Sequence, residues 1–455
     1  MMFIDFLLAD FKLNREADAL VWRNHKYSYA LLSEQVLKWK ASLSSYTLHP
    51  GTIVALQGDF SPTGVALFLA LLDAGVILVP LTTSVMNKRA EFMDIAGVER
   101  LIEIDSATDT IQVTSLTPAT PCHPLCSQLA SAHHPGLVLF SSGSTGKSKA
   151  ALHDMVPFLE KFKVRRKAAR TISFLLYDHI GGINTMLHTL SNGGCLITVT
   201  DRSPDGVLEA IERFQVELLP TSPTFLNLVL ISEAYKRHDV TSLKQITYGT
   251  EPMPESALKR LHALLPGVQL MQTYGLSEVG ILRAKSKSSD SLWVKVGGEG
   301  FETRIVDNIL HIKARSAMLG YLNAPSPFTE DGWFVTGDRV EADGEYLRIL
   351  GRDSDLINVG GHKVYPAEVE SVILEMDSVS GVEVFGTKNP ITGHMVCARV
   401  VLKTPEDPRE FSHKLKEFCS TRLENFKVPV RVLVEEQETH SPRFKKMRRQ
   451  QSLYQ

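Results

Sequence analysis

Few cysteines, little net charge and few long hydrophobic runs characterise this 455-residue sequence. The five cysteines are scattered and odd in number, which argues against a disulfide framework and for a reducing compartment. A net charge of −2 gives no bulk electrostatic reason to bind nucleic acid or an anionic membrane. No targeting segment and no internal repeat is visible. We therefore expect a cytoplasmic protein with no nucleic-acid partner.

One hydrophobic run, residues 64–81, is just long enough to cross a membrane. Asp73 lies in its middle, Gly75 follows and Pro80 stands near its end. These residues predict a buried helix over 65–72, a turn, and a short strand over 76–79. No membrane span is therefore expected.

The chain is rich in alternating helical and strand patterns. Short apolar runs typical of parallel strands occur at residues 52–56, 76–79, 137–140, 195–199, 218–220, 245–248 and 269–272. Helical patterns lie between several of them, as at 205–214 and 255–264. This alternation predicts an α/β fold with at least one parallel sheet. Beyond residue 300, short alternating segments are typical of antiparallel hairpins, and the chain ends in a small α+β unit.

A loop of serine, glycine and threonine follows the strand predicted at 137–140. Residues 141–147 read Ser-Ser-Gly-Ser-Thr-Gly-Lys, and Lys149 comes two positions later. Such small residues let backbone N–H groups approach an anion closely, while the lysines add positive charge. We interpret this loop as a phosphate-binding loop; the alternative is a flexible surface loop. The P-loop pattern of kinases fails, because it needs a glycine where Ser141 stands.

Four more segments follow in order and complete a family pattern. They are QTYGLSEVG from Gln272, GYLNAPSPFTEDGWFVTGDRV from Gly320, GRDSDLINVGGHKVYPAEVE from Gly351 and VPVRVLVEEQETHSPRFKKMRR from Val428. With the loop, they resemble the adenylate-forming superfamily of acyl- and aryl-CoA synthetases, peptide-synthetase adenylation domains and beetle luciferases. The chain is most similar to a stand-alone acyl- or aryl-CoA synthetase.

The resemblance implies a fold and a reaction. The fold would be a large domain of layered α/β subdomains plus a distorted β-barrel, residues 1–352, and a small mobile α+β domain, residues 353–455, with a hinge at Asp353. ATP and Mg²⁺ would activate a small carboxylic acid as an acyl-adenylate, releasing pyrophosphate. The acyl group would then pass to a thiol, with CoA the expected acceptor. A phosphopantetheinylated carrier protein in trans is one alternative, and a nucleotide-binding relative with lost catalysis is another.

The resemblance also implies a nucleotide site. Phosphates would lie on the loop, and Thr145 would also act in catalysis. The loop residues are Ser142, Gly143, Ser144, Thr145, Gly146 and Lys149. The family usually carries proline and glycine where Ser148 and Ala150 stand here.

Three later segments would complete that nucleotide site. Gly249, Thr250 and Glu251 would border the adenine, Tyr274 would stack on it, Gly275 would belong to the same nucleotide-binding segment, and Ser277 would reach phosphate. Glu278 would act in catalysis by binding Mg²⁺, a hard cation that prefers carboxylate oxygens; its alternative is a solvated loop residue. Asp338 and Arg352 would hold the ribose, since a carboxylate accepts from two vicinal hydroxyls. Asp338 could instead cap a turn after Gly337.

The remaining implied residues concern the acid, the thiol and the catalytic cation. His179, Thr273 and Gly280 would line the acid pocket, although His179 could equally cap the Gly181–Gly182 turn. Gly360, Gly361 and Lys363 would enter the site for thiol transfer, although Lys363 could be a plain surface lysine.

Lys445 is the predicted catalytic lysine. Both Lys445 and Lys446 have an arginine three residues later, but counting from Val428–Pro429 selects Lys445. Phe444 stands where the family has glycine. The alternative reading of this segment is a solvated basic tail.

Overall fold

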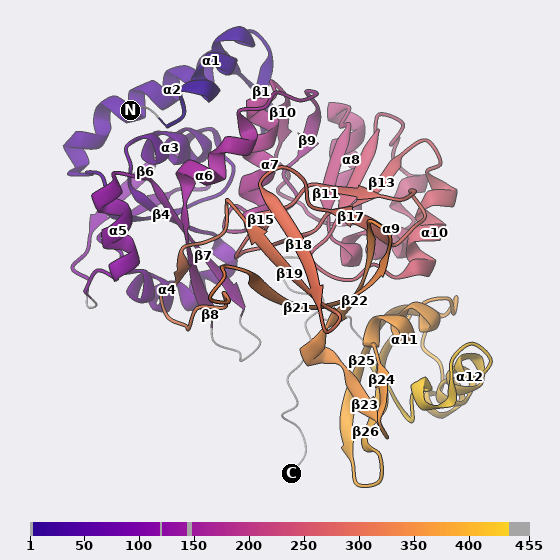
Figure 1. The fold of residues 1–455 in the computed structure, drawn as a ribbon. Coiled ribbons are helices and arrows are strands. Elements are labelled where there is room, and N and C mark those ends of the chain that lie inside the picture. The colour runs from indigo at the N-terminus through magenta and orange to yellow at the C-terminus, as the bar shows by residue number, and fades with distance from the viewer. Residues whose placement is uncertain (1–2, 119–120, 143–147, 436–455) are drawn as a thin grey trace.

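The structure is a computed structural model, and it describes residues 3–118, 121–142 and 148–435. Figure 1 shows a large body formed by the first three quarters of the chain and a smaller domain below it. Among the described residues, no helix is long and apolar enough to cross a membrane. All five cysteines are free thiols, which confirms that no disulfide framework supports the fold.

The first sheet of the large body carries the serine-rich loop. Its seven strands run in the order β20-β8-β7-β4-β3-β5-β6, and β3, β4 and β7 are parallel neighbours. The strands are β3 (Ile53–Gln57), β4 (Ile77–Leu81), β5 (Arg100–Ile104), β6 (Ile111–Ser115), β7 (Gly136–Ser142), β8 (Ser148–Asp154) and β20 (Gly320–Tyr321). Four helices alternate with these strands along the chain: α3 (Pro62–Asp73), α4 (Arg89–Ala96), α5 (Pro124–Ala132) and α6 (Met155–Leu159).

Helix α3 settles the interpretation of the hydrophobic run. Ser61 caps its first turn by accepting the N–H of Gly64, and Pro62 occupies the first helical turn, where no N–H is needed. Every residue of the helix is buried. The strand β4 follows at once. The predicted helix–turn–strand reading of residues 64–81 is therefore confirmed.

The second sheet is also mainly parallel and runs β13-β12-β11-β9-β10-β1-β2. Its strands are β1 (Asp18–Trp22), β2 (His25–Ser28), β9 (Arg170–Ile172), β10 (Cys195–Ile197), β11 (Leu218–Thr221), β12 (Gln245–Tyr248) and β13 (Gln269–Gln272). Helices α7 (Ile180–Ser191), α8 (Pro204–Phe214), α9 (Pro223–Ser232) and α10 (Glu255–Leu264) alternate with its strands, while α1 (Asp5–Leu13) and α2 (Tyr29–Ser42) lie at the amino end.

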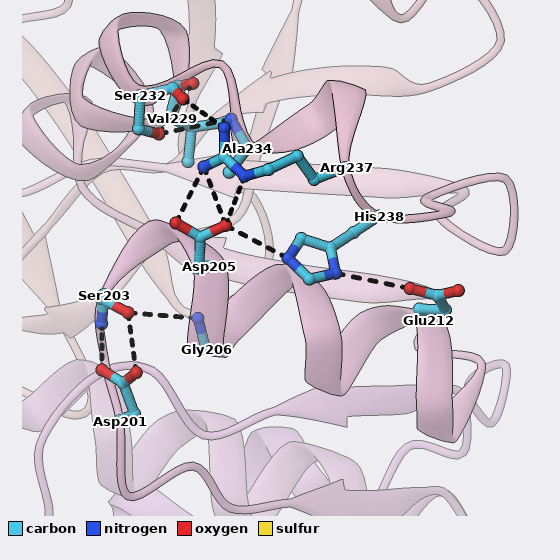
Figure 2. A network of polar contacts seen from close by, with 10 residues as sticks. All are labelled: Asp201, Ser203, Asp205, Gly206, Glu212, Val229, Ser232, Ala234, Arg237 and His238. Atoms are coloured by element: carbon cyan, nitrogen blue, oxygen red, sulfur yellow. Dashed lines mark hydrogen bonds and ion pairs between the residues drawn. The ribbon is translucent and has the colours of Figure 1, made fainter.

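A surface network anchors the start of α8 (Figure 2). The carboxylate of Asp205 accepts two hydrogen bonds from the Arg237 guanidinium, one from Nε at 2.9 Å and one from Nη2 at 2.8 Å. His238 lies between Asp205 and Glu212, at 3.2 and 3.4 Å. Ser203 caps the helix by accepting the N–H of Gly206. Because these ion pairs are exposed, each contributes little stability, and they supply matched controls for buried carboxylates elsewhere.

A third, antiparallel sheet stands where the barrel was expected, and it runs β16-β17-β22-β21-β19-β18. Its strands are β16 (Ala284–Ser286), β17 (Trp293–Val296), β18 (Phe301–Val306), β19 (Ile309–Ala314), β21 (Phe334–Asp343) and β22 (Tyr346–Arg352). A two-stranded hairpin, β14 (Gly275–Leu276) and β15 (Gly280–Ile281), precedes it. The predicted change to antiparallel hairpins late in the chain is confirmed.

The smaller domain follows β22 and has its own hydrophobic core. It contains β23 (Ile357–Val359), β24 (His362–Val364), α11 (Pro366–Ile373), β25 (Val379–Asn389), β26 (Gly393–Leu402), α12 (Pro408–Ser420) and β27 (Arg431–Glu435). Asp353, the predicted hinge, begins a short 3-10 turn and forms an ion pair with Arg339.

Among the described residues, hydrogen bonds from α9 and from the start of α10 connect the smaller domain to the large body, in addition to the Arg339–Asp353 ion pair. The amide of Asn227 on α9 donates to the carbonyl of Ser380, at 3.2 Å. The Ser371 hydroxyl on α11 accepts the N–H of Glu255, at 3.1 Å, and its carbonyl accepts the hydroxyl of Ser256, at 3.1 Å. These bonds define the docked arrangement of the two domains.

Candidate active site

Strand β8 joins the serine-rich loop to the segments that follow it by more than a hundred residues. Its Ala151 pairs with Tyr321 of β20, and Asn323 bonds the backbone of both Ser148 and Ala150, at 2.9 and 3.0 Å. The ring nitrogen Nε2 of His153 lies 2.6 Å from the carbonyl oxygen of Ser277. Burial lowers the pKa of His153 to about 4, so the imidazole is neutral and Nε2 carries the donated hydrogen.

Glu278, Tyr321 and Lys149 converge at this junction. The Tyr321 hydroxyl donates to Glu278 Oε1 at 2.6 Å, and Lys149 Nζ lies 5.2 Å from the centroid of the same ring. Burial and the nearby carboxylate raise the pKa of Tyr321, which keeps the hydroxyl protonated as a donor. Glu278 and Lys149 thus share Tyr321 as a neighbour, Glu278 at its hydroxyl and Lys149 over its ring.

A second carboxylate, Asp338, lies buried between two donors. Tyr274 donates its hydroxyl to Oδ2 at 2.5 Å, and Arg352 Nε lies 2.8 Å from Oδ1. Burial raises the pKa of Asp338, while Arg352 and Tyr274 oppose the rise. The turn at Gly337 is bridged instead by Thr336, whose hydroxyl accepts the N–H of Asp338 at 2.9 Å. The turn-cap reading of Asp338 is therefore wrong, and each carboxylate oxygen keeps a lone pair for a ligand.

The segment predicted to border adenine lies at the carboxyl ends of β12 and β13. Gly249 faces Thr273 closely, because a Cβ at 249 would stand 2.7 Å from the Thr273 carbonyl oxygen. Thr250 is exposed and adopts a positive φ of 76°, which is unusual for a threonine. Glu251 accepts the N–H of Thr224 at 2.8 Å, so its carboxylate also anchors the start of α9. Tyr274 is buried, with its hydroxyl on Asp338.

His179 stands at the start of α7 and caps it. Its Nδ1 accepts the N–H of Gly181 at 3.0 Å, and a Cβ on Gly182 would stand 2.0 Å from the Leu176 carbonyl oxygen. The capping interpretation is thus observed, while a role in an acid pocket stays a prediction. The neighbouring Asp178 is buried and accepts the Thr82 hydroxyl at 3.0 Å.

Gly275 and Gly280 lie on the two strands of the β14–β15 hairpin, where Gly275 pairs with Ile281 and Gly280 with Leu276. A Cβ on Gly275 would stand 2.5 Å from Ile281 Cδ1, so only glycine fits there. Gly280 has a φ of 82°, and a Cβ there would meet only Phe158 and Ser316, each at 3.6 Å. Gly280 is therefore less crowded than Gly275, although it is buried.

Gly360, Gly361 and Lys363 lie on the smaller domain and are exposed. The two glycines form the turn of the β23–β24 hairpin, with φ of 59° and 91°. Two consecutive positive φ values are the reason for glycine at both positions. The structure does not bring this hairpin into contact with Asp338 or Glu278.

Several predicted site residues lie outside the described residues. They are Gly143, Ser144, Thr145, Gly146 and Lys445, and of Ser142 only the backbone is described. Conversely, sequence reasoning missed Tyr321, Asn323 and His153 as parts of the site. The segment from Gly320 was part of the family pattern, so Tyr321 could have been found by asking which of its polar residues reach Glu278.

The residues present fit a magnesium ion that arrives with a nucleotide. Mg²⁺ is usually held by one or two carboxylates plus phosphate oxygens and water, rather than by a protein cage. Glu278 is half-buried, and its carboxylate accepts a hydrogen bond from Tyr321, whose ring also neighbours Lys149. Among the described residues, no group of three metal-ligating side chains exists, so a protein cage is not offered there.

Comparisons with known proteins agree with this arrangement. The model of the AMP-binding enzyme family matches residues 9–308, and that of the AMP-binding enzyme C-terminal domain matches residues 368–442. The mouse mitochondrial medium-chain acyl-CoA ligase ACSF2 is 24% identical, over 91% of this chain and 81% of that protein. The indoleacetate–CoA ligase of Aromatoleum aromaticum is 29% identical, over 66% of this chain and 63% of that protein.

Solved structures share the whole fold. The anthranilate CoA ligase AuaEII, solved with anthranoyl-AMP, has a TM-score of 0.81 at 18% identity, covering 98% of this chain and 95% of that one. The o-succinylbenzoate CoA synthetase MenE of Bacillus subtilis has a TM-score of 0.76 at 21% identity, covering 97% and 96%. At these identities the likeness concerns the fold, including the division into a large and a small domain.

Proposed function

The chain belongs to the AMP-binding enzyme family of adenylate-forming enzymes, and from this premise we propose that it is an AMP-forming acid–thiol ligase acting on a carboxylic acid, ATP and CoA. The observation that carries the proposal is that Glu278 and Lys149 share Tyr321 as a neighbour, while Asp338 lies close enough to Glu278 for their charges to interact. Each of the three charged side chains offers what one part of ATP requires: an oxygen ligand for its metal ion, a cation for its phosphates, and acceptors for the ribose.

The residues divide the work of adenylation. A carboxylate is a poor electrophile, so it attacks the α-phosphorus of ATP, forming an acyl-phosphate bond as the bond to pyrophosphate breaks. We assign the ribose hydroxyls to the free lone pairs of Asp338, with Tyr274 and Arg352 as positioning residues. We assign Lys149 to the phosphates. Lys445 would stabilise the charge that moves between the two oxygens, which is the kind of electrostatic contribution that dominates such reactions.

Glu278 would hold the Mg²⁺ that accompanies ATP, and Tyr321 would fix the orientation of its carboxylate. When bound, the ion would neutralise charge on the phosphate oxygens.

We predict that Glu278→Gln raises the Mg²⁺ concentration needed for half-maximal activity and lowers the maximal rate by about tenfold. An amide keeps an acceptor for Tyr321 but loses the charge that the ion needs. Pyrophosphate exchange measured across a Mg²⁺ titration gives the result. Glu212→Gln, in the surface network of Figure 2, is the matched control. An unchanged Mg²⁺ dependence in Glu278→Gln would remove the metal assignment.

We also propose that the domains divide near Asp353 and that the smaller domain must leave its docked position for thiol transfer. The proposal is supported by the exposure of the Gly360–Gly361 hairpin in the docked arrangement. A loop that delivers a thiol has to reach the acyl group, and it cannot do so from the surface.

Holding the domains together tests this motion. Asn227→Cys and Ser380→Cys, in a Cys122→Ser background that removes the exposed native thiol, place two thiols at the contact. A short bifunctional maleimide should leave pyrophosphate exchange intact and reduce CoA-thioester formation in proportion to the cross-linked fraction. The two single-cysteine variants are the controls. Retention of full thioester formation in the cross-linked protein would contradict the motion.

The first test of the function is acid-dependent exchange of labelled pyrophosphate into ATP, with aryl, aliphatic and amino acids. Exchange with one class establishes adenylation, and CoA and a phosphopantetheinylated carrier protein are then compared as acceptors. A folded protein that binds ATP but exchanges with no acid would favour a relative with lost catalysis. We also propose a cytoplasmic location and no nucleic-acid partner, because the cysteines are free thiols and the net charge is small.

A further inference from the structure

Lys161, in the 3-10 turn Glu160–Phe162, holds an ammonium group among apolar neighbours. Its Nζ donates to the carbonyl of Ile281 at 3.2 Å and lies 5.1 Å from the ring centroid of Phe158 and 5.0 Å from that of Phe162. Within the described part of the chain, no carboxylate forms an ion pair with it. Burial lowers the pKa of Lys161 to about 7. A buried ammonium without an opposite charge lowers the free energy of unfolding unless other interactions offset that cost.

This ammonium lies close to Gly280 on the β14–β15 hairpin. Ile281, its acceptor, is the next residue on strand β15. Phe158 lies between them, because its Cε2 is among the nearest atoms to a Cβ built on Gly280, and its ring also contacts Lys161. Although burial shifts its pKa so far, Lys161 is only half-buried.

Helix α7 presents polar residues on one side. All of its residues are buried except Asn184, Thr185 and His188, which are half-buried and spaced so that they share one side of a helix. The helix packs against β15. Burial, together with the charges of Arg166 and Lys161, lowers the pKa of His188 to about 4. The charged groups that act on His188 are therefore all positive.

We infer that the acid activated in the proposed reaction is a dicarboxylic acid, whose second carboxylate is held by Lys161 while the first meets ATP. This inference rests on the proposed function. Glu278, which is proposed to hold the metal ion of ATP, and Ile281, the acceptor of Lys161, are three residues apart, so their Cα atoms lie no more than about 10 Å apart. A chain of that length, or a substituted aromatic ring, bridges them.

Matched acids and matched variants test the inference. Octanedioate and octanoate differ only at the distal carbon, as do terephthalate and 4-methylbenzoate. Wild-type protein should exchange pyrophosphate faster with the diacid of each pair. Lys161→Met should lower kcat/KM for the diacid by about 10- to 100-fold, the usual contribution of a hydrogen bond to a charged group, and leave the monoacid nearly unchanged. Lys163→Met, at an exposed lysine paired with Glu160, is the control.

A second readout separates recognition from a purely structural role. Lys161→Met should raise Tm, because it removes a charge that lacks an opposite partner while keeping the length of the side chain. If Lys161 only holds the hairpin in place through the Ile281 carbonyl, Lys161→Met should instead lower Tm and reduce exchange with both acids of a pair equally. That result, or a wild-type preference for the monoacids, would overturn the inference while leaving adenylation in place. No exchange with any acid would overturn the proposed function and the inference with it.

The pH dependence gives an independent check. Above a pH of about 7 the free lysine loses its proton, so kcat/KM for the diacid should fall relative to that of the monoacid as pH rises through this value. The titratable groups whose charges interact with Lys161 are His153 on β8 and His188 on α7, and both are neutral there because burial lowers each pKa to about 4. A parallel pH profile for both acids would contradict recognition by Lys161.

Discussion

Asp338→Asn should lower kcat/KM for ATP by about 100-fold, mostly through KM, in a protein that stays folded. The buried carboxylate is the acceptor proposed for both ribose hydroxyls, and hydrogen bonds to a charged group contribute about 1.5–3 kcal/mol each. Asparagine offers one oxygen in place of two and turns a donor toward a hydroxyl. Tyr274 keeps an acceptor in the amide oxygen, and Arg352, whose side chain is half exposed, can turn to water.

The matched control for this change is Asp205→Asn. Asp205 also receives an arginine, but it does so on the surface, at the start of α8 (Figure 2). Its replacement should leave the KM for ATP unchanged. Initial rates across an ATP titration, with Tm measured for both variants, give the answer. If Asp338→Asn bound ATP normally, the ribose assignment would fail.

Lys445→Ala should lower the rate of adenylation by about 10²–10³, the usual effect of removing one preorganised charge from a reacting centre. Lys446→Ala should keep most of the activity. Both lysines lie outside the described residues, so this prediction rests on their spacing from Val428–Pro429 and on the family resemblance.

The pair of lysine variants checks the register as well as the role. Single-turnover formation of the acyl-adenylate isolates the chemical step from thiol transfer, so it is the measurement to use. Equal losses in both variants would show that the register is wrong. Phe444→Gly, which restores the usual glycine, should not slow the wild-type reaction if the loop adopts the family's backbone.

Elements with a strong local pattern were predictable from sequence. The strands β12 and β13 and the helix α10 have the predicted bounds, because each is a short apolar or amphipathic run between clear turn residues. The parallel pairing of β11, β12 and β13 follows the predicted alternation. The strand β8 was not predicted, since its pairing with β7 depends on the course of the loop between them and not on its own composition.

The sequence points to a candidate residue where the proposed role depends on that residue's own chemistry. Asp338 and Glu278 are such candidates, and in the structure each carboxylate accepts a hydrogen bond from a tyrosine. Tyr321 was missed because β20 is only two residues long and has no periodicity to read. Its meeting with Glu278 depends on strand order in a sheet whose other members lie far away in sequence.

Some residues combine an observed structural contact with a proposed role in the site, and sequence alone cannot separate the two. His179 caps α7, as any histidine before two glycines could, whether or not an acid lies beside it. Glu251 anchors the start of α9 through a backbone N–H, and no side-chain pattern announces that contact. Backbone partners leave no trace in the sequence of the segment that supplies them.

Three of the hydrogen bonds between the two domains also have a backbone group on one side, and this bears on evolutionary drift. The backbone groups are the carbonyls of Ser380 and Ser371 and the N–H of Glu255. A backbone group persists whatever side chain replaces its residue. The docking surface can therefore diverge on one side without a compensating change on the other, and pairwise covariation between relatives should be weak there even if the docked arrangement is universal.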